Sequence, residues 1–243
     1  MTTLLRFAIF VMFVVASTIG PAGAADSNER LTVGVTFDIP GMGYKNPETG
    51  AIDRVDFVQV LDKERIQALQ DGVVDVVISQ LTITPDRAEQ VDFSIPYYTT
   101  GEGLLVPVGS GIKGFDDLAG KRIAATAGSL SLRRMTASLP SLPGATLVVT
   151  PTSMGTVQAV MNDEADAASN DLIDLMFLQK ASQNPDAYEL IDIGANFEPK
   201  PFGAAVKKGN QELVDRLNAA IESLQANGDI DRLLNEAIAT VGQ

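Results

Sequence analysis

Short apolar runs alternate with segments of helical periodicity along most of this chain, and this alternation constrains the fold more than any other feature. The apolar runs have the length of strands, and the segments between them repeat apolar residues at helical spacing. We predict strands at residues 31–35, 57–60, 74–78, 103–108, 122–125, 146–149 and 188–193. We predict helices at residues 62–70, 131–139, 153–162, 171–180 and 211–227. Strands that alternate with helices favour an α/β fold built on largely parallel sheets.

The first residues have the pattern of a secretory signal peptide. One arginine, Arg6, precedes an apolar run at residues 7–15, and Ala22, Gly23 and Ala24 form a small-residue cleavage pattern. The apolar run is shorter than the roughly 20 residues that a membrane-spanning helix needs. We therefore expect residues 1–24 to be removed and the mature protein to reside in the periplasm.

Composition narrows the chemistry. The chain contains no cysteine and no histidine, which removes disulfides, lipid attachment to a cysteine, thiolate chemistry and the commonest metal ligand. No loop has the oxygen-ligand spacing of a calcium site, so we expect neither a metal nor another cofactor. The 31 acidic residues outnumber the 18 Lys and Arg, giving a net charge of −13 that is spread along the sequence. A distributed negative charge disfavours nucleic acid as a partner.

One segment combines a buried strand with a candidate anion-binding side chain. The apolar run at residues 76–78 is followed by a polar turn at residues 79–82, which would lie at the carboxyl end of the strand. Open α/β sheets bind ligands at that edge. Thr84 then fits the N-cap of a short helix and Pro85 its first position, which puts Arg87 on the first turn.

Arg87 has two interpretations. Its guanidinium can grip a carboxylate through two parallel hydrogen bonds, helped by the Thr82 hydroxyl and nearby backbone N–H groups. The alternative is an ordinary surface arginine that pairs with Glu89 or Asp92. The residues alone leave both open.

A family resemblance favours the first interpretation. The segment LTITPDRAEQVDFSIPYY resembles the signature of the periplasmic solute-binding proteins of polar amino-acid ABC transporters, family 3. The resemblance continues through LTVGVTFDIPGMGYKNPETG, RIQALQDGVVDVVIS, GIKGFDDLAGKRIAATAGS, EADAASND and PFGAAVKKGNQELVDRLNAAIESLQANG, nearly everything from Leu31 onward. It implies a monomeric α/β clamshell of two lobes joined by a double crossover, the type 2 periplasmic-binding fold. Lobe 1 would comprise residues 25–105 and 200–243, and lobe 2 residues 106–199, with crossovers in GLLVPVGSG and GANFEPKPFGAAV.

One departure from the family concerns the first crossover. Relatives usually carry an amphipathic helix between the loop that ends here at Asp53 and the strand at residues 57–60. Residues 38–53 contain prolines and glycines but no apolar periodicity, although a parallel crossover normally needs a dozen or more residues, usually helical. We predict that this helix is missing and that one face of the lobe 1 sheet is less covered than in relatives.

The resemblance assigns roles to individual residues. Arg87 would hold the α-carboxylate of an amino acid, assisted by Thr82 and by backbone groups near Gln80 and Leu81. Asp171, in SNDLID, would bind the α-ammonium from the other lobe. By its position Asp171 is also a candidate N-cap for the following helix, and the two roles are compatible.

Residues in three further segments extend the predicted pocket. In the turn AGSLS, Ser129, Ser131 and the backbone of Leu130 would receive the same carboxylate, although relatives often have threonine where Leu130 stands. Arg65, in DKERIQAL, resembles an arginine that reaches the ligand side chain in glutamate- and aspartate-binding relatives; alternatively it pairs with Asp62 or faces solvent. The loop FDIPGMGYKN would add Asp38 and Tyr44.

These roles predict a binding protein that captures glutamate, aspartate or another polar amino acid and delivers it to an inner-membrane ABC permease. A second possibility is an enzyme on the same scaffold, similar to periplasmic cyclohexadienyl dehydratases, in which Glu102 or Asp171 would act as the acid. A third is a free ligand-sensing module.

Overall fold

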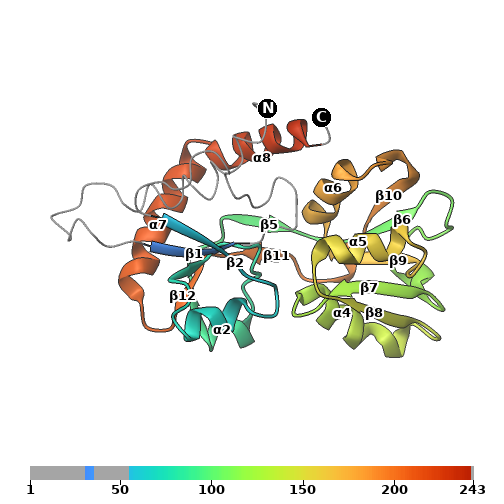
Figure 1. Ribbon diagram of the computed structural model, residues 1–243, viewed down its shortest axis with the longest axis horizontal. Coiled ribbons are helices and arrows are strands. Elements are labelled where there is room, and N and C mark those ends of the chain that lie inside the picture. The colour runs from blue at the N-terminus through green and yellow to red at the C-terminus, as the bar shows by residue number, and fades with distance from the viewer. Residues whose placement is uncertain (1–30, 36–54, 242–243) are drawn as a thin grey trace.

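The computed structural model describes residues 31–35 and 55–241, which form two lobes side by side (Figure 1). The predicted signal peptide and the loop with Asp38 and Tyr44 lie outside the described residues. So does the predicted loss of the first crossover helix, because residues 36–54 connect the first two strands.

Lobe 1 is built on a five-stranded sheet with the order β2-β1-β3-β12-β4. These strands are β1 Leu31–Val35, β2 Val55–Gln59, β3 Val76–Val77, β4 Val91–Phe93 and β12 Ala205–Lys207. Its helices are α2 Arg65–Gln70, α3 Pro85–Ala88, α7 Gln211–Ala226 and α8 Asp229–Thr240. β1 pairs in parallel with β2 and β3, whereas the returning strand β12 is antiparallel to β3 and β4. In Figure 1, α7 and α8 lie on one side of this sheet and α2 on the other.

Lobe 2 repeats the arrangement with a sheet of order β10-β6-β9-β7-β8. Its strands are β6 Glu102–Pro107, β7 Arg122–Thr126, β8 Thr146–Thr150, β9 Ala167–Asp171 and β10 Tyr188–Asp192. Its helices are α4 Leu130–Ser138, α5 Ser153–Met161 and α6 Leu172–Ala181, with short 3-10 turns η1 Phe115–Leu118, η2 Leu139–Ser141, η3 Pro185–Ala187 and η4 Gly194–Asn196. The parallel strands β7, β8 and β9 and the helices between them match the predicted α/β pattern.

A two-stranded antiparallel ribbon connects the lobes. β5 (Tyr98–Thr100) runs into lobe 2 and β11 (Lys200–Phe202) returns, with Lys200 opposite Thr100 and Phe202 opposite Tyr98. The predicted first crossover, residues 103–111, is therefore displaced, because residues 103–107 already belong to β6 inside the lobe 2 sheet. The connection lies a few residues earlier than the predicted boundary at residue 105.

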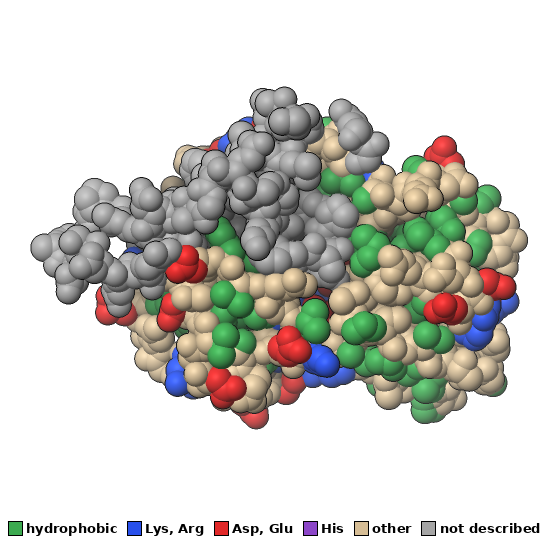
Figure 2. All heavy atoms as spheres, in the orientation of Figure 1, with side chains coloured by type: hydrophobic (Ala, Val, Ile, Leu, Met, Phe, Trp, Pro, Cys, Tyr) green, Lys and Arg blue, Asp and Glu red, His purple; other side chains and the backbone are tan. Residues whose placement is uncertain are grey.

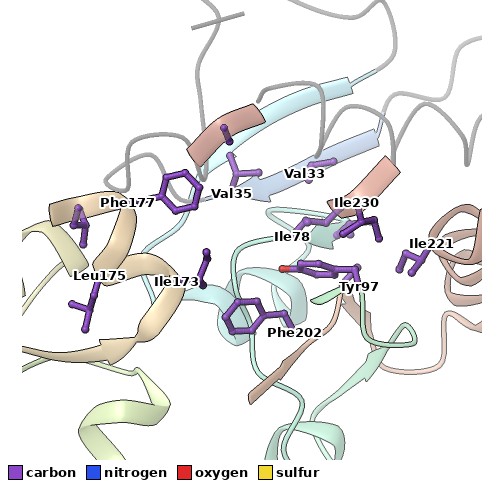
Figure 3. Close-up of a cluster of buried hydrophobic side chains, with 14 of the residues drawn as sticks. Val33, Val35, Ile78, Tyr97, Ile173, Leu175, Phe177, Phe202, Ile221 and Ile230 are labelled. Atoms are coloured by element: carbon purple, nitrogen blue, oxygen red, sulfur yellow. The ribbon is translucent and has the colours of Figure 1, made fainter. Parts of the chain in front are cut away.

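The hydrophobic core continues from one lobe to the other. One cluster of buried side chains includes Val33 and Ile78 of lobe 1 together with Ile173 and Phe177 of α6 in lobe 2. Figure 3 shows Phe177 pointing toward Val35 of β1 and Ile173 lying beside the ribbon residue Phe202. The lobes are thus in direct apolar contact, as expected for a closed clamshell.

The backbones also approach closely. Gly128, in the turn that follows β7, has a φ of +83°, and a Cβ built there would lie 2.5 Å from the Cα of Lys63 in lobe 1. No side chain fits at that distance, so a glycine is required for the lobes to meet in this way.

Candidate functional site

The turn after β3 has the features expected of a binding edge. Gln80 adopts a positive φ of 45°, a conformation that costs free energy for a residue with a side chain. The Ser79 hydroxyl is fully buried and has no hydrogen-bond partner among the described residues. Leu81 points into the lobe 1 core instead, so only its backbone is available to a ligand. Strain and an unsatisfied hydroxyl at one strand end are typical of sites whose polar groups are completed by a ligand.

Arg87 lies beside this turn and is 6% exposed. Thr84 and Pro85 occupy the predicted N-cap and first helical positions, although no side-chain hydrogen bond of Thr84 caps the helix. The guanidinium donates through Nη1 to the carbonyl of Thr82 at 2.9 Å and through Nη2 to the carbonyl of Gly128, across the lobe boundary, at 3.2 Å. Thr82 therefore contacts Arg87 through its carbonyl, whereas the sequence predicted that its hydroxyl would assist in binding the solute carboxylate.

The charge of Arg87 has no counter-ion among residues 31–35 and 55–241. The surface alternative does not hold, since Asp92 pairs instead with Lys208 at 2.7 Å. Asp86, the nearest acid in the sequence, pairs with Arg133 of lobe 2 at 2.5 Å. Burial, and then the neighbouring positive charges of Arg65 and Arg133, lower the pKa of Arg87 to about 10. A buried cation held only by carbonyls is a strong receptor for an anion.

Arg65 is also buried, at 3% exposure, but it has a counter-ion. Its Nη2 lies 2.9 Å from a carboxylate oxygen of Asp62, and its guanidinium also donates to the carbonyls of Asp62 and Ser79. The Asp62 pairing that the sequence left open is thus present, whereas solvent exposure is not. Arg65 borders the turn that carries Ser79, but its charge is already balanced.

Asp171 lies at the end of β9 and is engaged by a residue that the sequence did not indicate. Its Oδ1 is 2.9 Å from the Nζ of Lys200, the first residue of the returning ribbon strand. Asp171 occupies the N-cap position of α6 but makes no capping hydrogen bond through its side chain. Burial raises the pKa of the Asp171 carboxyl, an effect that Lys200 opposes and Glu102 reinforces.

Both serine hydroxyls of the turn after β7 are already hydrogen-bonded to other groups of the protein. The Ser129 hydroxyl accepts a hydrogen bond from the Leu132 N–H at 3.0 Å and so caps α4. The Ser131 hydroxyl accepts from Lys200 Nζ at 2.7 Å. Leu130 begins α4 and contributes no polar side chain. The backbone of the turn, rather than its two hydroxyls, remains the candidate ligand contact.

The ion pair between Lys200 and Glu102 was not predicted from the sequence. Both side chains are fully buried and their charged groups are 2.7 Å apart. Glu102 accepts further hydrogen bonds from Ser169 at 2.9 Å and from Arg134 at 3.3 Å. The one signal in the sequence is the position of Lys200 between Pro199 and Pro201, where two rings restrict the backbone.

The described part of the chain contains neither a candidate metal site nor a candidate membrane-spanning helix. Its acidic side chains include no group of three or more placed to hold a metal ion. None of its helices is both long and apolar enough to cross a bilayer. Acidic and basic side chains are interspersed on the face drawn in Figure 2, in agreement with the distributed charge of the sequence.

Known proteins share this fold and much of this sequence. Residues 31–239 match the model of the bacterial extracellular solute-binding proteins, family 3. The ABC transporter glutamine-binding protein of Bacillus subtilis (strain 168) is 29% identical over 235 residues, covering 88% of this chain and 83% of that protein.

Two solved structures are similarly related. An ancestral arginine-binding protein bound to arginine is 29% identical with a TM-score of 0.73, covering 86% of this chain and 98% of the other. An ancestral amino acid-binding protein, described as a precursor of cyclohexadienyl dehydratase, is 29% identical with a TM-score of 0.71, covering 86% and 95%. The predicted two-lobe α/β fold is confirmed, and the chain belongs to the bacterial extracellular solute-binding proteins, family 3.

Proposed function

We propose that this protein is the solute-binding component of an ABC uptake system and that it captures an amino acid, or a closely related carboxylic acid, by its carboxylate. The observation that carries the proposal is the buried guanidinium of Arg87, which has no counter-ion among the described residues. A solute carboxylate would supply the missing charge through two parallel hydrogen bonds. No covalent step is required.

The same contact explains why binding would favour closure. Arg87 belongs to lobe 1, but one of its hydrogen bonds already reaches the carbonyl of Gly128 in lobe 2. A carboxylate at Arg87 would also face the backbone of the turn that contains Ser129 and Leu130, so both lobes would contact one solute. A ligand that interacts better with the closed form than with the open form shifts the protein toward closure. The closed form would then dock on the permease.

The side chain of the solute is less constrained. Arg65 was the reason to expect glutamate or aspartate, and its pairing with Asp62 weakens that reason because the charge is already balanced. Relatives of similar identity are named for different amino acids, glutamine and arginine among them. We retain glutamate and aspartate as the first solutes to test, with Arg65, Asp38 and Tyr44 as proposed side-chain contacts.

We propose the periplasm as its location, reached through removal of residues 1–24. Membership of an extracellular binding-protein family supports this placement. We further propose that the mature protein acts as a monomer without a metal or cofactor. Mass spectrometry of the exported protein would give an N-terminus at Ala25 if this cleavage is right.

A thermal melt tests the binding function. The mature protein would be heated with and without each of the twenty amino acids and with 2-oxoglutarate and pyruvate. A solute present at a hundred times its dissociation constant adds about 2.7 kcal/mol of stability, an easily measured shift. A cooperative transition that none of these solutes moves would refute the proposal.

A second candidate function is an enzyme of the dehydratase type, favoured by the raised pKa of the buried Asp171 carboxyl, which makes it a better proton donor. The ancestral neighbour described as a precursor of cyclohexadienyl dehydratase adds support. Loss of water and carbon dioxide from prephenate or arogenate, followed by the absorbance of the aromatic product, would distinguish an enzyme from a binding protein.

A further inference from the structure

The ammonium group of Lys200 is surrounded by oxygen atoms of lobe 2. A lysine ammonium has three N–H donors, and three oxygen atoms lie within 2.9 Å of the Lys200 Nζ, one as a hydrogen-bond acceptor and two as ion-pair partners. The partners are Glu102 at 2.7 Å, Asp171 at 2.9 Å and the Ser131 hydroxyl at 2.7 Å. Lys200 itself is fully buried, so water does not compete for these contacts.

This arrangement is the one that a free amino acid would need for its own α-ammonium, which also has three donors. Two carboxylates and a hydroxyl, supplied by lobe 2 next to the lobe boundary, are already occupied by a cation of the protein. We propose that Lys200 substitutes for the ligand's α-ammonium, so that the site binds small carboxylates without an ammonium group, the 2-oxo acids, in preference to the matching amino acids. This inference rests on the proposed carboxylate contact with Arg87 and narrows the class of solute.

The charge balance of the described residues supports the inference. Arg65 is balanced by Asp62, and the cations Lys200 and Arg134 are balanced by Glu102 and Asp171. Of the buried cations Arg65, Arg87 and Lys200, only Arg87 has no paired carboxylate in the described part of the chain. A monoanionic oxo-acid group neutralises the charge of Arg87. A zwitterion brings a positive charge with its negative one, and this second cation needs a carboxylate of its own in a medium of low dielectric constant.

Asp174 is the competing receptor for an ammonium group. It is 2% exposed and lies one helical turn beyond Asp171 on α6. Burial raises the pKa of Tyr97, and the charges of Asp174 and Asp171 add to this effect, so both carboxylates lie near that ring. If Asp174 received an ammonium, amino acids would be preferred, and the preference would disappear on substitution of Asp174.

Matched pairs of solutes test the inference, because the members of a pair differ only at the α-position. We would titrate the purified protein calorimetrically with L-alanine and pyruvate, L-valine and 2-oxoisovalerate, and L-phenylalanine and phenylpyruvate, because each of these oxo acids carries a single negative charge. The oxo acid should bind at least tenfold more tightly than its amino acid in every pair that binds. Equal or tighter binding of the amino acid would overturn the inference but leave the proposed function standing. Binding by neither member of any pair, together with a thermal transition that none of the twenty amino acids moves, would overturn both.

A charge-removing variant adds a second test. In Lys200→Gln the amide still donates hydrogen bonds but the positive charge is lost, so the ratio of affinities should move at least tenfold toward the amino acid. Lys208→Gln is the matched control, since Lys208 is half exposed and pairs with Asp92 away from these residues. An unchanged ratio in Lys200→Gln would contradict the inference, as would loss of an amino-acid preference in Asp174→Asn. If Lys200→Gln does not fold, the wild-type ratios decide.

Discussion

Replacing Arg87 tests the contact on which binding depends. The guanidinium has five N–H donors and uses one on each of two carbonyls, which leaves enough donors for a bidentate carboxylate. Hydrogen bonds to charged groups contribute about 1.5–3 kcal/mol each. Arg87→Met removes both hydrogen bonds to the solute carboxylate. Binding should therefore weaken by about 3–6 kcal/mol, or roughly 10²- to 10⁴-fold in the dissociation constant.

Arg87→Lys separates charge from geometry. A lysine keeps the positive charge but makes a single bond where the guanidinium makes two, so binding should weaken by roughly 10- to 100-fold. Isothermal titration with L-glutamate and 2-oxoglutarate would measure both variants. Arg232→Met is the control, because Arg232 is half exposed on α8 and pairs only with Asp229 and Glu236.

Arg87→Met should still fold. Its substitution removes two hydrogen bonds to carbonyls, but it also removes a buried charge whose cost is visible in the lowering of the pKa of Arg87 to about 10. Circular dichroism and a urea melt would confirm the folded state before binding is compared. Affinity of Arg87→Met within threefold of the wild-type value would refute the role of this side chain.

Three further perturbations have defined outcomes. Gly128→Ala should keep both lobes folded but hinder their contact, because its Cβ would lie 2.5 Å from Lys63; X-ray scattering with 2-oxoglutarate should show a more open protein, and an unchanged profile would contradict this. Glu102→Gln should lower the free energy of unfolding by about 1–3 kcal/mol in a urea melt, since its buried lysine keeps only one carboxylate. The pairing with Arg122 lowers the pKa of Asp166, so its contribution to stability is present at neutral pH and is lost as the pH falls below the usual value of 3.8. Asp166→Asn should therefore lose stability at pH 7 but little at pH 2, and equal losses at both would argue against the pairing.

The alternation of apolar and helical segments predicted most of the fold. Every predicted strand and helix overlaps an observed one, and the long helix α7 buries Leu213, Leu217, Ile221 and Leu224, which lie at helical spacing. β9 was missed because its residues, AASND, are small or polar although all are buried, so they lack the apolar signal of a central strand. The predicted crossover lies too late because it overlaps β6, an apolar strand that already belongs to the lobe 2 sheet.

The candidate site also contains one residue that the sequence indicated and one that it did not. The position of Arg87 on the first turn after β3 was predictable, because a strand, a turn, a proline and an arginine follow one another locally, whereas its proposed role came from the family resemblance. Lys200 was not predictable, because lysine is rarely buried without a partner and its partners come from β6, β9 and α4. Only the folded chain brings these three segments around one ammonium group. The proposed preference for 2-oxo acids therefore could not be predicted from the sequence alone.

A crystal structure of the protein with 2-oxoglutarate or L-glutamate bound tests the central claim most directly. We predict closed lobes with a solute carboxylate whose oxygens lie about 2.7–3.2 Å from the guanidinium nitrogens of Arg87. A bound solute whose carboxylate lies elsewhere, with Arg87 still bonded only to carbonyls, would contradict the account.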